Sequence, residues 1–296
     1  MKKLSVIQAD NITLGLALIY PYMGKNICET FGIEGESAVR RGLAEYAATR
    51  GSDLRKKHQA LGMKTNLKNF FYYGSNPYSE ASFVNHMGHV TEEEDVRQTT
   101  YCPFVEEMIR RGQRRLAVTY CEEVHPPLWQ SYAPTAIVNL GKHLAQEGSD
   151  RCLFDVFLRP GRMTAEQRKE CFEAYDPDFK GDRREEYITP DSKTGNCAMT
   201  IIMAASLYRS CTEAFGADAV PVLEKGAEEA LADYIQVLRT CAGKLQVPFD
   251  QAFVAENYVF SSTLEEDAAW EEFADEEIRA FARRCIYDKF HALAGV

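Results

Sequence analysis

The sequence predicts an α+β fold in which a small antiparallel sheet and a long helix are flanked by two related helical modules. Short alternating runs typical of strands cluster between residues 84 and 160, while long stretches with helical spacing precede and follow them. The flanking stretches also resemble each other, which favours a duplicated module over unrelated additions. A chain of 296 residues is long enough to bury a core of one large domain or two ordinary ones.

These observations divide the chain into four parts. We expect an N-terminal helical module over 1–83, an α/β core over 84–160, a linker over 161–195 and a C-terminal helical module over 196–296.

The N-terminal module is predicted to be helical over residues 10–62. Leu14, Ala17 and Leu18 keep helical spacing, which is expected to be broken at Pro21 and again at a turn near Gly32.

The core begins with two predicted strands, 84–91 and 95–100. Pro103 suits a first helical position, so a helix is expected from there to about residue 127, bent at Gly112 and ended by His125-Pro126-Pro127.

A hairpin is predicted to close the core. With a turn at Glu147–Asp150, Lys142 would face Asp155 as a favourable cross-strand pair, and His143 and Cys152 would share one face of the sheet.

The polar, Pro- and Gly-punctuated stretch that follows predicts a linker with one short helix, and a last amphipathic helix is expected over about 264–292. Between them, one constant offset aligns Phe31-Gly32 with Phe215-Gly216 and Gly42 with Gly226, without a gap. We therefore predict an internal repeat in which 31–66 corresponds to 215–250.

Composition restricts the functional class. A net charge of -10 argues against a nucleic-acid partner, which requires a basic face. No apolar stretch is long enough to span a bilayer, so we expect no membrane partner and a cytoplasmic location. Nine cysteines spread over a chain of this size favour reduced thiols rather than a disulfide framework. The acidic surface and helical flanks are compatible with a homodimer.

The candidate chemistry lies in the core. Cys102 precedes a predicted helix start, where backbone N–H groups and the helix dipole stabilise a thiolate. Cys121 and His125 are four residues apart on one helix, so the imidazole could deprotonate the thiol. Cys152, with His143 beside it, is expected to converge on the same place.

Two other interpretations stay open for this cluster. Cys102, Cys121, His125 and Cys152 could together hold zinc, although the close CxxC pairs typical of zinc sites are missing. Buried cysteines are also often plain core residues, and we assign the other six to that role.

Four segments carry a resemblance to a known family. The run from Phe31 to Phe71, then CPFVEEMIRRG, YCEEVHPPLWQSYAP and EGSDRCLFDVF, resembles the L-2-amino-thiazoline-4-carboxylic acid hydrolase family over about residues 14–160. Cys102, Cys121, Tyr132 and Cys152 occupy positions of the family motifs. This chain has His125 in place of the family's aspartate, and Ala133-Pro134 in place of its Asn-Pro.

The resemblance implies hydrolysis of a cyclic amidine-like C–N bond in a small thiazoline substrate. In that hypothesis Cys121 or Cys102 is the nucleophile and His125 the base, while Tyr132, Cys152 and His143 bind the substrate, with no cofactor unless the cluster holds zinc. The alternative is a non-catalytic small-molecule or metal sensor that uses the same Cys/His cluster for binding.

Overall fold

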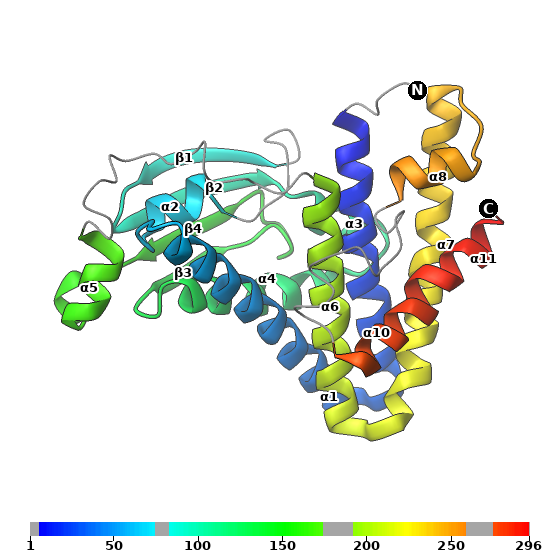
Figure 1. Ribbon diagram of the computed structural model, residues 1–296, viewed down its shortest axis with the longest axis horizontal. Helices are drawn as coiled ribbons and strands as arrows, with labels where there is room; N and C mark the ends of the chain where they lie inside the picture. The colour runs from blue at the N-terminus through cyan, green and yellow to red at the C-terminus, as the bar shows by residue number, and fades with distance from the viewer. Residues whose placement is uncertain (1–5, 75–82, 174–191, 259–274, 296) are drawn as a thin grey trace.

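A computed structural model describes residues 6–74, 83–173, 192–258 and 275–295 and gives the fold (Figure 1). The chain forms a small sheet at one side and a group of long helices at the other. The strands are β1 (Val84–Val90), β2 (Glu94–Tyr101), β3 (Ile137–Lys142) and β4 (Cys152–Phe157). They form one antiparallel sheet in the order β1-β2-β4-β3. The predicted α+β class is confirmed.

Helices account for most of the remaining described chain. In the first half these are α1 (Val6–Ala60), α2 (Leu67–Tyr72), α3 (Pro103–Arg110), α4 (Arg114–Tyr132), the 3-10 turn η1 (Pro160–Arg162) and α5 (Ala165–Phe172). In the second half these are α6 (Ser192–Phe215), η2 (Gly216–Asp218), α7 (Ala219–Leu245), α8 (Gln251–Asn257), α10 (Glu276–Ala282), the π-helical turn η4 (Arg283–Asp288) and α11 (Lys289–Ala294).

Helix α1 connects the two sides of the molecule. It changes direction at Gly32, whose φ of 61° and ψ of -135° lie outside the helical region. The first part packs among the C-terminal helices, and the part after Gly32 runs toward the sheet (Figure 1). The predicted break at Pro21 is wrong: the helix continues through this residue, and the neighbouring Tyr20 and Met23 are buried in the core.

Helix α4 extends further than expected. Pro126 and Pro127 lie inside it, and the helix ends only after Tyr132. Each proline removes one backbone hydrogen bond, which costs stability. Burial of Trp129 against Phe154 of the sheet and of Tyr132 against His58 and Phe70 offsets that cost, because both side chains are almost completely inaccessible to solvent.

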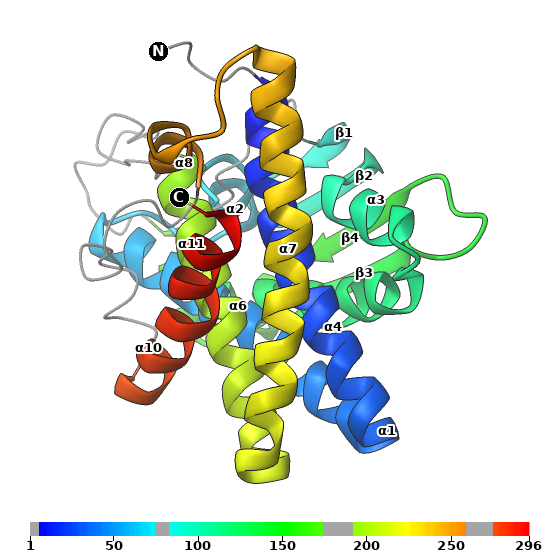
Figure 2. The same cartoon turned by 90° about the vertical axis from the view of Figure 1, so that its right-hand side faces the viewer.

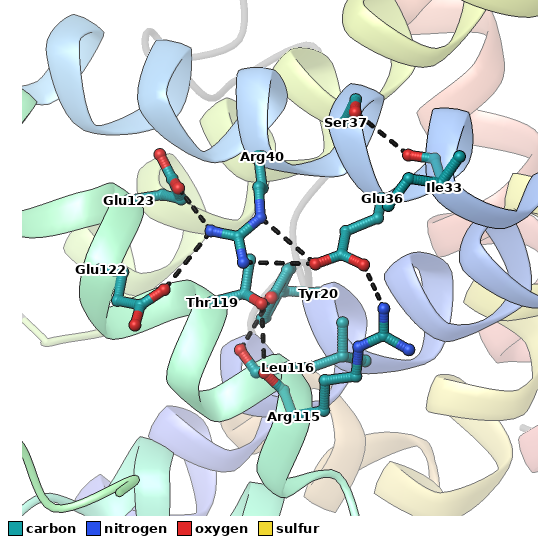
Figure 3. A network of polar contacts seen from close by, with 10 residues as sticks. All are labelled: Tyr20, Ile33, Glu36, Ser37, Arg40, Arg115, Leu116, Thr119, Glu122 and Glu123. Atoms are coloured by element: carbon teal, nitrogen blue, oxygen red, sulfur yellow. Dashed lines mark hydrogen bonds and ion pairs between the residues drawn. The ribbon is translucent and has the colours of Figure 1, made fainter.

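A polar network joins α1 to α4 on the surface (Figure 3). Arg40 donates to Glu36 at 3.2 Å and to Glu123 at 2.6 Å, and Arg115 donates to the other oxygen of Glu36. Beneath it, the buried Tyr20 hydroxyl donates to the carbonyl of Leu116 at 2.9 Å. The pairing fixes the position of α4 relative to α1.

The hairpin of β3 and β4 has another register than predicted. Asp155 faces Asn139, and Lys142 faces Leu153 after an irregularity next to Leu140. The strands end earlier than expected because residues 143–151 form a loop that turns inward. His143 and Ala145 are buried within it, so His143 leaves the sheet instead of sharing its face with Cys152.

The predicted linker is partly packed. Thr164 caps α5 with a reciprocal capping box, and Arg55 holds Glu170 through two hydrogen bonds of 2.7 Å. Cys171 is buried beside Thr65, and its carbonyl accepts a hydrogen bond from the Asn66 side chain at 3.1 Å. The rest of the linker, residues 174–191, and most of the predicted last helix, residues 259–274, lie outside the described residues.

The C-terminal helices α6 and α7 form a hairpin that packs against α1 (Figure 2). The turn contains Gly216, whose φ of 58° is close to that of Gly32, and the rings of Phe31 and Phe215 stack with centroids 4.0 Å apart. Helix α1, bent at Gly32, forms a second helical hairpin. That the two helical hairpins are copies of one module stays a prediction, and the matching turns support it.

The close contacts between the two helical hairpins are equivalent in both directions: a glycine of each one faces the corresponding residues of the other. A Cβ at Gly42 would meet Leu207 and Ser206 at 3.1 to 3.2 Å, and a Cβ at Gly226 would meet Met23 and Tyr22 at 2.6 to 2.9 Å. The offset that aligns Gly42 with Gly226 also aligns Met23 with Leu207 and Tyr22 with Ser206.

Candidate functional site

The predicted site residues lie between the inner face of the sheet and the helices α4 and α1. Strands β2 and β4 supply one wall, and the side of α4 that carries Cys121, His125 and Trp129 supplies the other. The core packing in this region includes Cys152, Phe154 and Trp129. The segments from which the candidates were drawn therefore meet in space.

Strand β2 contributes charged groups to this inner face. Its alternation places Asp95, Arg97 and Thr99 on one side, and the register sets Arg97 opposite Phe154 and Thr99 opposite Cys152. Thr99 donates to the Asn85 side chain on β1 at 2.7 Å. Charged residues at inward positions of a strand are unusual, because burial of a charge is costly without a partner.

Arg97 is enclosed by aromatic rings. Its guanidinium carbon lies 5.1 Å from the ring centroid of Phe71, 5.6 Å from that of Trp129 and 5.3 Å from that of Phe154. Cation–π attraction compensates part of the lost hydration but supplies no hydrogen-bond acceptor in the plane of the guanidinium. Burial lowers the pKa of Arg97, and the neighbouring Asp95 acts in the opposite direction.

Among the described residues, Asp95 is the only carboxylate that forms an ion pair with Arg97. The Arg97 Nε lies 3.5 Å from one of its oxygens. The side chain is fully buried, and within the described residues neither carboxylate oxygen nor the Arg97 Nε has a hydrogen-bond partner. Burial raises the pKa of Asp95, while Arg97 lowers it. The pair is a buried charge centre with unused hydrogen-bonding capacity.

The three candidate thiols are neighbours. Cys102 and Cys152 both raise the pKa of Cys121 electrostatically, and Cys152 does the same to Cys102. Cys152 is the best supported as an anion, because its Sγ accepts the backbone N–H of Leu144 at 3.3 Å and Arg97 lowers its pKa.

Burial keeps these thiols protonated. It raises the pKa of Cys102 to about 12, although the backbone N–H groups of Val105 and Phe104 act against it. Burial is also the main cause that raises the pKa of Cys121 and of Cys152. The expectation of a lowered pKa at Cys102 is wrong, because loss of hydration outweighs the helix start.

His125 is adjacent to Arg97 and the aromatic cage. Its ring lies 5.0 Å from the ring of Phe154 and 5.7 Å from that of Trp129. Burial, together with smaller effects of Arg97 and His143, lowers its pKa to about 3. The imidazole is therefore neutral at pH 7, and at this pKa it is a weak base. No hydrogen bond links it to Cys121 in the described structure.

His143 reaches the same region from the loop after β3. Burial lowers its pKa, and neither ring nitrogen has a hydrogen-bond partner among the described residues. Its electrostatic effect on His125 places the two imidazoles near each other.

Tyr132 lies further along α4 and is bonded to α1. Its hydroxyl donates to Nδ1 of His58 at 2.7 Å, and Nε2 of His58 donates to the carbonyl of Tyr73 at 3.3 Å. Burial lowers the pKa of His58 to about 4, so the ring is neutral. This network supports the end of the site beside Trp129.

Asp95, Arg97 and Trp129 were not among the predicted site residues. The signal for Asp95 and Arg97 was present in the strand EDVRQTTY, where the alternation puts both on the same face as Thr99. The sequence does not tell which face of an antiparallel strand is buried when both carry polar residues.

A metal site is not evident: in the described ranges no three His, Cys, Asp or Glu side chains are arranged to hold an ion.

The comparison with protein families agrees with the sequence motifs. Residues 16–156 match the L-2-amino-thiazoline-4-carboxylic acid hydrolase family. The resemblance is thus confirmed, and the matched segment runs from α1 to the end of β4 and includes all six predicted site residues. The hairpin of α6 and α7 lies outside the match to this hydrolase family. Neither a curated protein nor a solved structure matches the chain.

None of the described helices is long and apolar enough to cross a membrane.

Proposed function

We propose that this protein hydrolyses a C–N bond of a small cyclic amidine of the thiazoline type. A thiol of the Cys102, Cys121 and Cys152 cluster is the nucleophile, and His125 is the base. What supports the proposal is the group of three neighbouring thiols, with the neutral imidazole of His125 one helical turn from Cys121, in a segment that matches a family described as a hydrolase.

The chemistry needs one proton acceptor and one nucleophile. The thiol gives its proton to His125 while its sulfur attacks the amidine carbon, and His125 returns the proton to the nitrogen as the C–N bond breaks. A water molecule, deprotonated by the same imidazole, then attacks the carbon bound to sulfur and releases the thiol. Both groups are neutral at rest, and a cationic amidinium beside the thiol would favour its ionisation.

The three thiols differ in how well their surroundings stabilise the thiolate form. Cys152 receives the Leu144 N–H and lies near Arg97, and Cys102 receives backbone N–H groups at the start of α3. Cys121 is opposed by burial and by both neighbouring thiols. Its position four residues before His125 remains its main support as nucleophile.

Single Cys→Ala variants of these three thiols test the assignment, with 2-amino-thiazoline-4-carboxylate as substrate. The nucleophile variant is expected to lose at least 1,000-fold in kcat, on the order of what removal of a nucleophile costs. Cys211→Ala is the matched control, because burial raises the pKa of this α6 thiol to about 12 as well and it lies outside the site. Full activity in all three variants would contradict a thiol nucleophile.

A second candidate is a non-catalytic protein that binds a small molecule in the same place. The neutral state of the thiols and of His125 favours it, since nothing in the site is activated before a ligand binds. Alkylation with iodoacetamide near pH 7 separates the two: the hydrolase predicts that one thiol of the cluster reacts faster when 2-aminothiazoline is bound, whereas a binding protein predicts uniform protection.

A further inference from the structure

The proposed reaction leaves the Asp95–Arg97 pair without a role. Asp95 is fully buried, its oxygens have no hydrogen-bond partner in the described chain, and the nearest cation is the Arg97 Nε at 3.5 Å. A buried pair is normally tolerated when hydrogen bonds satisfy its remaining lone pairs and N–H groups. Here they are missing on both sides of the pair.

Other polar groups around the pair are also unsatisfied. Within the described residues the indole Nε1 of Trp129 and both ring nitrogens of His143 have no partner. Trp129 belongs to the cage around Arg97, and His143 and Arg97 both act on His125. Unpaired polar atoms from β2, α4 and the loop after β3 thus gather beside His125 and Cys152, where the reaction is proposed to occur.

We propose that this pair recognises the two charges of the substrate: Arg97 binds a carboxylate, and Asp95 accepts a hydrogen bond from a cationic amidine nitrogen. The inference rests on the proposed function and adds the groups that orient its substrate. A guanidinium offers planar N–H groups that fit a carboxylate with two hydrogen bonds, and a carboxylate is the natural acceptor for an amidinium.

The charge balance favours this class of ligand. A molecule with one carboxylate and one cationic nitrogen adds no net charge to a buried site, and it supplies both Asp95 and Arg97 with the partners they lack. A dianion such as phosphate would meet the Asp95 carboxylate beside the single guanidinium and be repelled. Binding of the zwitterion would also bring it close to Cys152, because the guanidinium that holds its carboxylate acts electrostatically on that thiol.

Two probes test the proposal by binding rather than turnover. The dissociation constants of 2-amino-thiazoline-4-carboxylate and of 2-aminothiazoline, which lacks the carboxylate, are measured by calorimetry. The wild type is expected to bind the carboxylate at least tenfold more tightly. Arg97→Lys keeps the charge but loses the planar fork, so it is expected to lose about tenfold in affinity for the carboxylate and none for 2-aminothiazoline.

Asp95→Asn provides the complementary variant and is expected to weaken both probes, because both carry the amidine. The matched control is Arg159→Lys. Arg159 also lies over a ring, Phe157 at 4.4 Å, and pairs with a carboxylate, Glu94 at 3.4 Å, but it lies on the half-exposed end of the sheet. It is expected to leave both affinities unchanged.

Equal affinities of the two probes in the wild type, an unchanged preference in Arg97→Lys, or binding of neither probe would overturn the proposal. If Arg97→Lys does not fold, the wild-type preference and the Asp95→Asn loss decide it. Failure of the hydrolase proposal is distinguishable: binding that depends on Arg97 without turnover contradicts only the hydrolase, and turnover without dependence on Arg97 contradicts only the recognition pair.

Discussion

Three thiols, two imidazoles and one ion pair lie between the sheet and α4, surrounded by aromatic and aliphatic side chains. Burial is the main cause of every pKa shift in this group. It favours the neutral form of each thiol and imidazole, whatever helix end or neighbouring charge acts in the other direction. The charge state of the site is therefore set by what packs around it.

His58 gives a test of this effect on stability. The unfolded chain protonates His58 below about pH 6.5, whereas burial lowers its pKa in the folded protein to about 4. The unfolded state thus binds more protons between these values, and the free energy of unfolding must fall as the pH decreases from about 6.5 to about 4, by up to about 3 kcal/mol.

Chemical denaturation at several pH values measures this dependence. His58→Gln is expected to remove the His58 part of the pH dependence. Tyr132→Phe is the control, since it removes the hydroxyl that donates to His58 but leaves the imidazole buried. Equal slopes in the wild type and His58→Gln would contradict the assignment.

The Asp95–Arg97 pair predicts a double-mutant effect. Arg97→Met leaves the buried Asp95 carboxylate without its counter-ion, which should reduce the free energy of unfolding by about 3 kcal/mol or more. In the double variant with Asp95→Asn no charge remains, so the loss is expected to be smaller than in Arg97→Met alone. Thermal and urea unfolding measure both, and additive losses would show that the two charges do not interact.

At the scale of elements, close approach of helices is permitted by glycine. A Cβ at Gly226 of α7 would lie 2.6 Å from the backbone Cα of Met23, and one at Gly42 of α1 would lie 3.1 Å from a Leu207 side-chain carbon. Both glycines also face backbone atoms, but those of Leu207 and Ser206 would lie 3.2 Å from a Cβ at Gly42, so the backbone approach is closer at Gly226. Backbone atoms cannot move aside without separating the helices.

Gly226→Ala is therefore expected to destabilise the protein by about 2 kcal/mol or more, and Gly42→Ala by less. Gly243 of α7 provides the control, because a Cβ there would meet nothing within 4 Å. Gly243→Ala should be neutral or stabilising by up to about 1 kcal/mol, since alanine has the higher helix propensity. Urea denaturation ranks the three variants by their free energy of unfolding. An equal loss of stability in Gly243→Ala would show that helix packing at Gly226 is not the cause of the loss.

At the scale of the whole molecule, one continuous core joins α1 to the C-terminal helices. Buried residues from α1, α4, α6, α7 and α11 belong to the same cluster, and Leu128, Leu140 and Leu144 pack against both this cluster and the core under the sheet. Arg111 adds a polar link, donating to Asp233 of α7 at 2.5 Å. The C-terminal hairpin is therefore part of the fold that supports the site.

This continuity predicts a single unfolding transition. Urea unfolding is followed by far-UV circular dichroism, which reports mainly on the helices, and by Trp129 fluorescence in a Trp270→Phe background, which reports on the site. The two curves are expected to coincide, and Gly226→Ala should shift both equally although it lies far from Trp129 in the sequence. Two separate midpoints would show that the hairpin and the site unfold independently.

The sequence by itself determined the α+β class, the strands β1 and β2 to within a residue or so at most ends, and the resemblance of residues 16–156 to a hydrolase family. The placement of Cys121 and His125 one helical turn apart on α4 also follows from the sequence, because helical spacing is a local property. That these two residues act together with Cys102 and Cys152 stays a prediction. Only the tertiary structure decided the rest. Packing of Trp129 and Tyr132 carried α4 past its prolines, and burial of His143 shifted the hairpin register. Aromatic rings enclose Arg97, so the face of β2 that carries Arg97 and Asp95 is the buried one. These outcomes depend on the free energy gained when apolar surfaces from distant segments are buried against each other. No short stretch of the sequence contains both surfaces, so it cannot reveal that free energy.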